Sequence, residues 1–257
     1  MRAPRRFTPD RGSPRLVRFR TAERTELFTE AVGAPPPVYG ERWVDAGEVA
    51  YRAFEPGRSK LSAGIVREWS GPIPSEGERW LYLGAATGTT ASHISDLVGP
   101  SGRVYALERS PRPFARLLAL AERWPNLLPV IADARDPRLF ASLVPPVDGL
   151  YADIAQPDQV EIVRRNAELF LARAGAAVVF ALKTASMGRD REPAAHLAAA
   201  ERDIAFGVDL VPSVRLDPFH KGHYLVGGRA RPDLFRAGLS RRPVTLSRGP
   251  RPVRSRR

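Results

Sequence analysis

The chain has 257 residues, enough to bury a sizeable core in one large domain or in one domain with a smaller companion. Its 40 lysine and arginine residues against 28 aspartate and glutamate residues give a formal net charge of +12. This excess favours a polyanionic partner such as nucleic acid, although the arginine preference of a GC-rich genome also accounts for it. The absence of cysteine excludes disulfides and thiolate metal sites.

The sequence contains no candidate membrane segment. No apolar run is long enough to cross a bilayer, and the basic N-terminus lacks the apolar stretch of a signal peptide. We therefore expect a cytoplasmic protein without membrane contact, and the absence of cysteine fits a reducing compartment.

The first part of the chain predicts an arm followed by a small domain. Residues 1–20 are basic and rich in proline, which is typical of a flexible arm. Residues 21–57 carry short β-like runs separated by turn residues, and they predict a small β-rich N-terminal domain. A helix is expected at about 59–69, and the Gly-Pro pair that follows it marks its end.

From Glu78 onward, strand-like runs alternate with helical stretches. This alternation predicts βαβ units and a largely parallel sheet with helices on both faces. The expected strands are 79–84, 104–108, 127–133, 147–154 and 176–183, and the expected helices lie near 89–98, 112–124, 157–173 and 191–205.

Two more strand-like runs, 207–217 and 223–228, follow without a helix between them. Two strands joined by a short turn form a hairpin, so one of them must run antiparallel to its partner. An α/β sheet that is mostly parallel and ends in an antiparallel hairpin is the Rossmann-like architecture of class I methyltransferases, which we assign to residues 58–228. The composition of residues 229–257 predicts a disordered basic tail. This tail either contacts nucleic acid through its charge or is a solvated appendage without a partner.

The junction between the strand at 79–84 and the following helix is built from small residues. Gly84, Ala85, Ala86 and Gly88 let the backbone approach a ligand at the carboxyl end of the strand. No lysine follows them, which argues against a triphosphate-binding loop, and the spacing also departs from the dinucleotide fingerprint. A plain strand–helix turn would have a similar sequence.

Acidic residues end the next three strands. Glu108 is placed to bind both hydroxyls of a ribose, Asp133 to meet the amino group of an adenine, and Asp153 stands near Gln156. Each acid alone is most simply a solvated or capping residue. Together they predict an adenosine ligand without phosphates, of which S-adenosylmethionine is the common one, and its sulfonium cation favours nearby carboxylates. Thr89 and Thr90 would then offer hydroxyls to the methionine end.

Several strings closely resemble the fibrillarin family of RNA-guided ribose 2′-O-methyltransferases. They are "LYLGAATGTTASHISDLVGPSGRVYALE", "IADARDP" and "ADIAQPDQ", with "VYGER" and "RSKLSAGI" upstream, and the resemblance spans roughly residues 30–228. It implies S-adenosylmethionine as the cofactor. Beside the small loop residues Gly84, Ala85 and Gly88, the cofactor contacts that it implies are Thr89, Thr90, Glu108, Arg109, Asp133, Ala134, Asp153 and Gln156.

Ribose 2′-O-methyltransferases commonly carry a Lys-Asp-Lys set with a fourth polar residue, and the resemblance places this set at Lys60, Asp153, Lys183 and His223. Lys183 is the candidate that activates the ribose hydroxyl, with Asp153 orienting that lysine near the methyl group. Lys60 would hold the ribose or an adjacent phosphate, while His223 has no assigned role. No metal is needed, and His93 is interpreted as structural.

The predicted function is S-adenosylmethionine-dependent 2′-O-methylation of ribose in rRNA or tRNA. The resemblance implies a box C/D guide RNA, a Nop-domain scaffold protein and a kink-turn-binding protein as partners. Two alternatives stay open: a methyltransferase for a protein acceptor such as a glutamine side chain, and a non-catalytic RNA-binding protein on the same fold.

Overall fold

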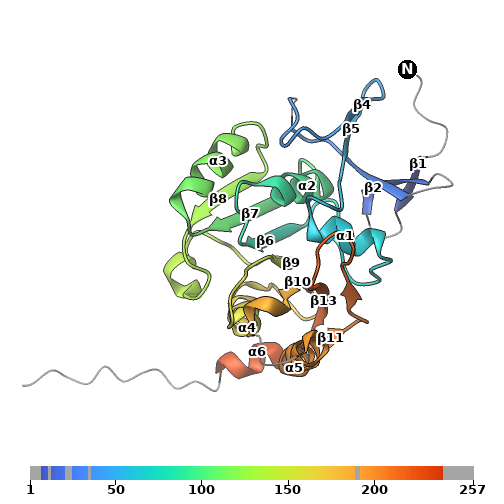
Figure 1. Cartoon of the computed structure of the whole chain (residues 1–257). Coiled ribbons are helices and arrows are strands. Elements are labelled where there is room, and N and C mark those ends of the chain that lie inside the picture. Colours follow the sequence, from blue (N-terminus) through green and yellow to red (C-terminus); the bar gives the residue numbers. More distant parts are fainter. Residues whose placement is uncertain (1–6, 11–12, 21–24, 34–35, 189–191, 240–257) are drawn as a thin grey trace, which may run out of the picture.

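The computed structural model describes residues 7–10, 13–20, 25–33, 36–188 and 192–239. These residues form a large β-sheet with helices on both faces and a smaller sheet beside it (Figure 1). Every helix among the described residues is too short or too polar to span a membrane.

The large sheet has the strand order β11-β13-β10-β9-β6-β7-β8. Strands β8, β7, β6, β9 and β10 are parallel, whereas β13 runs antiparallel to β10, β11 and β12. The predicted class I methyltransferase sheet is therefore confirmed. The strands are β6 Arg79–Leu83, β7 Arg103–Glu108, β8 Leu127–Ile131, β9 Gly149–Ala152, β10 Ala177–Lys183, β11 Val208–Leu210, β12 Val214–Arg215 and β13 His223–Ala230.

One predicted element of this sheet differs from the structure. The run 207–217 is two short strands, β11 and β12, which both pair with β13. Pro212 lies between them and has no backbone N–H to donate, so it interrupts the ladder.

Helices cover both faces of the large sheet. Side chains of α1, α2 and α3 share one core with Trp80 and Tyr82, and side chains of α4, α5 and α6 share the other with Leu81 and Leu83. Successive strand residues point to opposite faces, so every buried strand is apolar on both sides. The helices are α1 Lys60–Val66, α2 Thr89–Val98, α3 Pro111–Ala121, α4 Gln159–Phe170, α5 Pro193–Ala205 and α6 Pro232–Leu239, with short 3-10 helices η1 Pro137–Phe140 and η2 Thr184–Ser186.

The small sheet lies beside α1 and α2 (Figure 1). It is antiparallel throughout and has the order β1-β2-β3-β5-β4. Its strands are β1 Phe7–Asp10, β2 Ser13–Arg20, β3 Thr25–Glu30, β4 Trp43–Asp45 and β5 Ala50–Ala53.

The prediction of a flexible arm over residues 1–20 is wrong for its described part, 7–10 and 13–20, which forms β1 and β2. Leu16 of β2 is fully buried. Two of the basic residues that suggested an arm have partners: Arg15 donates to the Asp96 carbonyl oxygen (2.7 Å) and Arg18 to that of Ile65 (3.3 Å). These carbonyls belong to the last turns of α2 and α1, where a positive charge is favourable.

The predicted tail also begins later than expected. Strand β13 continues to Ala230, and α6 follows it with Leu234 buried in the core. Residues 229–239 are therefore folded, because Ala230 of β13 and Leu234 of α6 are buried in the core. The rest of the predicted tail, 240–257, lies outside the described residues.

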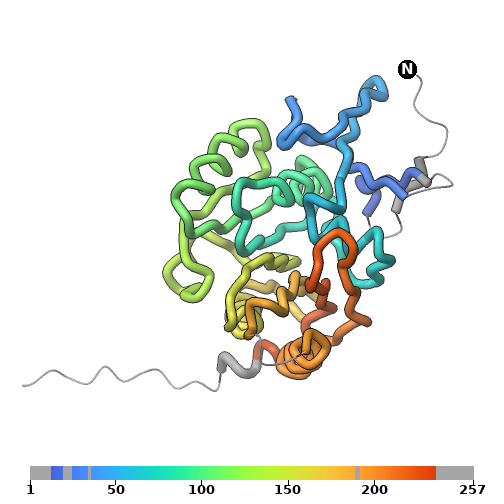
Figure 2. Tube along the Cα trace, in the orientation of Figure 1, coloured from blue at the N-terminus to red at the C-terminus, as the bar shows by residue number. Residues whose placement is uncertain are grey.

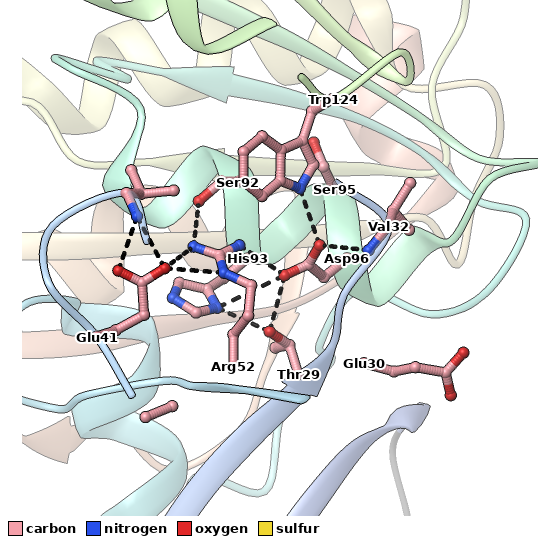
Figure 3. A network of polar contacts seen from close by, with 12 residues as sticks. Thr29, Glu30, Val32, Glu41, Arg52, Ser92, His93, Ser95, Asp96 and Trp124 are labelled. Atoms are coloured by element: carbon pink, nitrogen blue, oxygen red, sulfur yellow. Dashed lines mark hydrogen bonds and ion pairs between the residues drawn. The ribbon is translucent and has the colours of Figure 1, made fainter. Parts of the chain in front are cut away.

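The two sheets are joined by a buried charged network around Arg52 (Figure 3). Arg52 lies on β5 and is fully buried; its guanidinium donates to Glu41 Oε1 (2.7 Å) and to Asp96 Oδ2 (2.8 Å). Asp96 belongs to α2 and also accepts from the Trp124 indole and the Val32 backbone N–H, each at 2.9 Å. The small sheet, the loop before β4 and helix α2 thus satisfy one another's buried charges.

His93 of α2 completes this network and has the structural role that we predicted. Its Nδ1 lies 2.8 Å from Thr29 Oγ1, and its Nε2 lies 3.0 Å from the Tyr39 hydroxyl. Burial, reinforced by the nearby Arg52 charge, lowers the pKa of His93 well below its ordinary value, so the ring is neutral. A neutral ring accepts one hydrogen bond and donates the other.

Arg52→Met is expected to lower the free energy of unfolding by about 3–5 kcal/mol, because it leaves two buried carboxylates without their cation. Urea denaturation measures this loss. Arg42→Met is the matched control in the same region, since Arg42 pairs with Glu26 at the surface and should cost less than about 1 kcal/mol. Equal losses for the two variants would contradict the role given to Arg52.

Candidate active site

A cavity of about 380 Å³ opens at the carboxyl ends of the parallel strands. Its lining comes from the loops after β6, β7, β8 and β9, where ligands bind in open α/β sheets. The sequence-predicted cofactor residues in this lining are Gly84, Glu108, Arg109, Asp133, Ala134, Asp153 and Gln156. Their predicted convergence on one space is therefore present in the structure.

The loop after β6 passes close to the end of β9, and glycine is required there. Gly84 has φ +81°, and a Cβ atom would lie 2.6 Å from the Asp153 carbonyl oxygen. Ala86 also has a positive φ, 49°, which is unusual for a residue with a side chain. This turn points the Ala86 N–H toward Glu108, which accepts it at 3.0 Å.

Glu108 holds two loops at the edge of the cavity. Its Oε2 accepts from Ala86, and its Oε1 accepts from the Ser110 backbone N–H at 2.7 Å. The residue is only 8% exposed. Each carboxylate oxygen has a second lone pair, so the fixed carboxylate can still accept hydrogen bonds from ligand hydroxyls.

Asp133 follows β8, lines the same cavity and is flanked by positive charges. Its Oδ1 accepts from the Arg135 backbone N–H (2.9 Å), and its Oδ2 lies 3.3 Å from Arg109 Nη1. A carboxylate accepts hydrogen bonds and donates none. Such a group suits the amino hydrogens of an adenine.

Four of the predicted cofactor residues lie outside this lining: Ala85, Gly88, Thr89 and Thr90. Gly88 caps α2 at φ +93° and packs against Leu120, which a Cβ would approach to 2.4 Å. The Thr90 hydroxyl, which we predicted to face the ligand, donates to Ser59 Oγ (3.0 Å). Residues Gly88 and Thr90 thus position α2 against α3 and α1, and their contact with a ligand stays a prediction.

The four predicted catalytic residues gather at the same edge of the sheet. Lys60 Nζ and Asp153 Oδ2 form an ion pair at 2.8 Å. Lys183 ends β10 and stands opposite His223 in the antiparallel pairing with β13. One prediction differs in detail: Asp153 was expected to orient Lys183, but its carboxylate binds Lys60, because α1 begins directly beside the end of β9.

His223 is partly buried beside charged groups. Burial lowers its pKa, the hydrogen bond with the Lys221 carbonyl and the charge of Asp153 oppose the shift, and the charge of Lys60 adds to it. His223 Nδ1–H donates to the Lys221 carbonyl (3.0 Å), which fixes the ring. The uncharged ring therefore predominates at neutral pH.

Residues 16–232 match the family model described as Fibrillarin. The chain belongs to the fibrillarin family. It is 41% identical over 203 residues to the fibrillarin-like rRNA/tRNA 2′-O-methyltransferase of Sulfolobus acidocaldarius, an alignment that covers 79% of this chain and 87% of that protein.

Solved structures of fibrillarins share the fold. That of Aeropyrum pernix fibrillarin with natively bound S-adenosyl-L-methionine aligns with a TM-score of 0.78 at 35% identity, covering 88% of this chain and 99% of the other. A fibrillarin/Nop5p complex aligns with a TM-score of 0.72 at 36% identity, covering 80% and 94%.

Two features of this fibrillarin site were missed by sequence reasoning. Ser59 caps α1 and receives the Thr90 hydroxyl, and a serine directly before the first helical residue is a recognisable N-cap. His220 Nε2–H donates to the Pro56 carbonyl (2.8 Å), so the loop before β13 lies beside the loop before α1 (Figure 2). Nothing in the local sequence predicts that second contact.

The lysine content carries a sequence signal for the site. Among 40 basic residues only three are lysines, namely Lys60, Lys183 and Lys221. Two of them are the predicted catalytic lysines of the family. Arginine stays protonated in proteins, so it does not replace an amine that must exchange a proton.

Gly84→Ala is expected to lower the free energy of unfolding by about 2 kcal/mol more than Gly175→Ala does. Gly175 is the matched control because its φ is +84° and nothing lies within 4 Å of its Cβ position, so it isolates the backbone strain from the collision with Asp153. Urea denaturation compares the two variants. Equal losses would show that the approach of the β9 end does not require glycine.

Proposed function

We propose that this chain transfers the methyl group of S-adenosylmethionine to the ribose 2′-hydroxyl of rRNA or tRNA. The observation that carries the proposal is the position of the Lys60–Asp153 ion pair, since Asp153 also lines the cavity. The acceptor and the cofactor would therefore meet at one carboxylate. The Sulfolobus acidocaldarius relative, an rRNA/tRNA 2′-O-methyltransferase, supports the reaction, and the S-adenosyl-L-methionine bound to Aeropyrum pernix fibrillarin supports the cofactor.

The residues of the cavity fit S-adenosylmethionine. Glu108 is held as an acceptor for two ribose hydroxyls, Asp133 is an acceptor for an amino group, and Gly84 lines the cavity without a side chain. The cofactor, when bound, would supply a methyl group on a positively charged sulfur. The negative charge of the Asp153 carboxylate would favour that cation.

The two lysines differ in their surroundings, and this difference separates their proposed roles. Lys60 is held by Asp153, so it is placed as a fixed cation for the ribose or an adjacent phosphate. The Lys183 amine forms no hydrogen bond or ion pair with another residue in the described part of the chain, since the hydrogen bonds of this residue use its backbone. The amine is therefore available to contact the ribose hydroxyl of the acceptor. We assign to Lys183 the removal of the hydroxyl proton.

The partners proposed for this chain follow its family. The fibrillarin/Nop5p complex supports a Nop-domain scaffold protein as a partner. A box C/D guide RNA and a kink-turn-binding protein complete the proposed assembly, in which base pairing of the guide would select the nucleotide. The cytoplasmic location and the absence of a metal stay predictions from the sequence.

Lys183→Ala is expected to reduce methyl transfer by about 10²–10⁴-fold, the range for losing one positioned proton-transfer group, while cofactor binding persists. Lys183→Arg should not restore transfer, because guanidinium does not release its proton. A single-turnover assay with tritiated cofactor on RNA measures the rate, and calorimetry measures binding. Arg202→Ala, an exposed change on α5, is the control. Near-normal transfer by Lys183→Ala would remove this residue from the mechanism.

Deleting residues 240–257, which hold seven arginines, is expected to flatten the salt dependence of RNA binding while cofactor affinity is unchanged. The deletion starts at 240 because residues 229–239 are part of the fold. Filter binding across a salt series measures the slope. A full-length variant with all seven arginines changed to glutamine separates charge from chain length. An unchanged slope in both variants would show that the segment does not contact RNA.

A further inference from the structure

Arg135 bridges two loops that line the cavity. It follows β8, and its Nη2 donates to Gln156 Oε1 (2.5 Å) in the loop after β9. The same guanidinium donates to both carboxylate oxygens of Asp158, from Nε at 3.1 Å and from Nη2 at 3.2 Å. Its Nη1 lies 3.8 Å from Asp133 Oδ2.

Asp158 anchors the arginine in one orientation. A guanidinium bound to both oxygens of a carboxylate is fixed in its plane as well as in its position. The Arg135 side chain in turn lowers the pKa of Asp158, which keeps the pair ionised. The ion pair with Asp158 therefore fixes the direction of the Arg135 Nη2 group, which also donates to Gln156.

Arg135 decides which way the Gln156 amide faces. A guanidinium has only donors, so the amide atom that it contacts must be the oxygen. The Nε2 group then lies on the other side of the amide and keeps two hydrogens to donate. It forms no hydrogen bond with another residue in the part of the chain that the structure describes, and Gln156 lines the cavity.

We propose that Arg135 is a positioning residue for the cofactor: held by Asp158, it turns the amide nitrogen of Gln156 toward a hydrogen-bond acceptor of the bound nucleoside. This inference rests on the proposed function, since it concerns the same cavity. Arg135 acts through Gln156, so its contribution depends on the glutamine being present.

A double-mutant cycle tests that dependence, with S-adenosylhomocysteine as the probe in calorimetry. Arg135→Met and Gln156→Ala should each weaken binding by about tenfold, the scale of a hydrogen bond with a charged partner. The double variant should bind S-adenosylhomocysteine no more weakly than the single variant of lower affinity. Both substitutions remove the same contact, so their effects should not add. Weakening by the product of the two factors would show that Arg135 acts independently and would overturn the inference.

Gln156→Glu distinguishes positioning from a purely structural link. A glutamate still accepts from Arg135, so the bridge between the loops persists, but it has no N–H to donate to the ligand. Binding should fall about as far as in Gln156→Ala. Unchanged affinity would mean that Gln156 only links the loops. The probe carries no sulfonium charge, so the added carboxylate does not favour it through that group.

Folding is checked on the same proteins. Arg135→Met should unfold at a urea midpoint close to that of Arg165→Met, whose arginine pairs with Glu161 on the surface of α4. Arg135→Lys keeps the charge but lacks the planar fork, and it should bind with intermediate affinity. A wild-type chain that binds no S-adenosylmethionine or S-adenosylhomocysteine would overturn the proposed function as well. Normal wild-type binding with an unchanged Arg135→Met would overturn this inference alone.

Discussion

The buried guanidinium of Arg52 ties the small sheet to helix α2, which packs on the large sheet. Its partners Glu41 and Asp96 come from the loop before β4 and from α2, and all three side chains are fully buried. Removing charges from water costs several kcal/mol per ion unless each finds a well-placed partner. Separating the small sheet from α2 would therefore leave these buried charges unpaired.

The position of the site follows from this arrangement. Arg15 and Arg18 of β2 bind carbonyls in the last turns of α2 and α1, while the first residues of the same helices meet at the Thr90–Ser59 hydrogen bond. Lys60 comes directly after Ser59 and reaches Asp153. The small sheet supplies none of the cavity lining, yet it holds both helices that start beside the site.

Within the cavity, backbone amides and arginines hold the carboxylates. Glu108 is fixed by two backbone N–H groups, and Asp133 lies between Arg109 and Arg135. Such partners pre-orient an acceptor before any ligand arrives, which lowers the cost of ordering it on binding. Arg135 extends this principle to a neutral group, because it determines the direction of the Gln156 amide.

The sequence alone determined the sheet, the glycine loop and the acids at the strand ends. Strand residues such as Leu81 and Val179 lie in apolar runs of a parallel sheet. Such runs, like the residues that form turns, are local properties of the sequence, so they predict the strands without the tertiary structure. Because parallel strands end at one edge, Glu108, Asp133 and Asp153 were predicted to converge, as the cavity lining has them.

Only the tertiary structure decided which groups pair. Asp153 binds Lys60, 93 residues earlier, and the Thr90 hydroxyl turns to Ser59. Composition likewise placed Arg15 and Arg18 in a flexible arm, whereas the fold gives them carbonyl partners on α2 and α1. A hydrogen bond depends on distances within about 3 Å between segments far apart in the chain, and neither periodicity nor composition contains those distances.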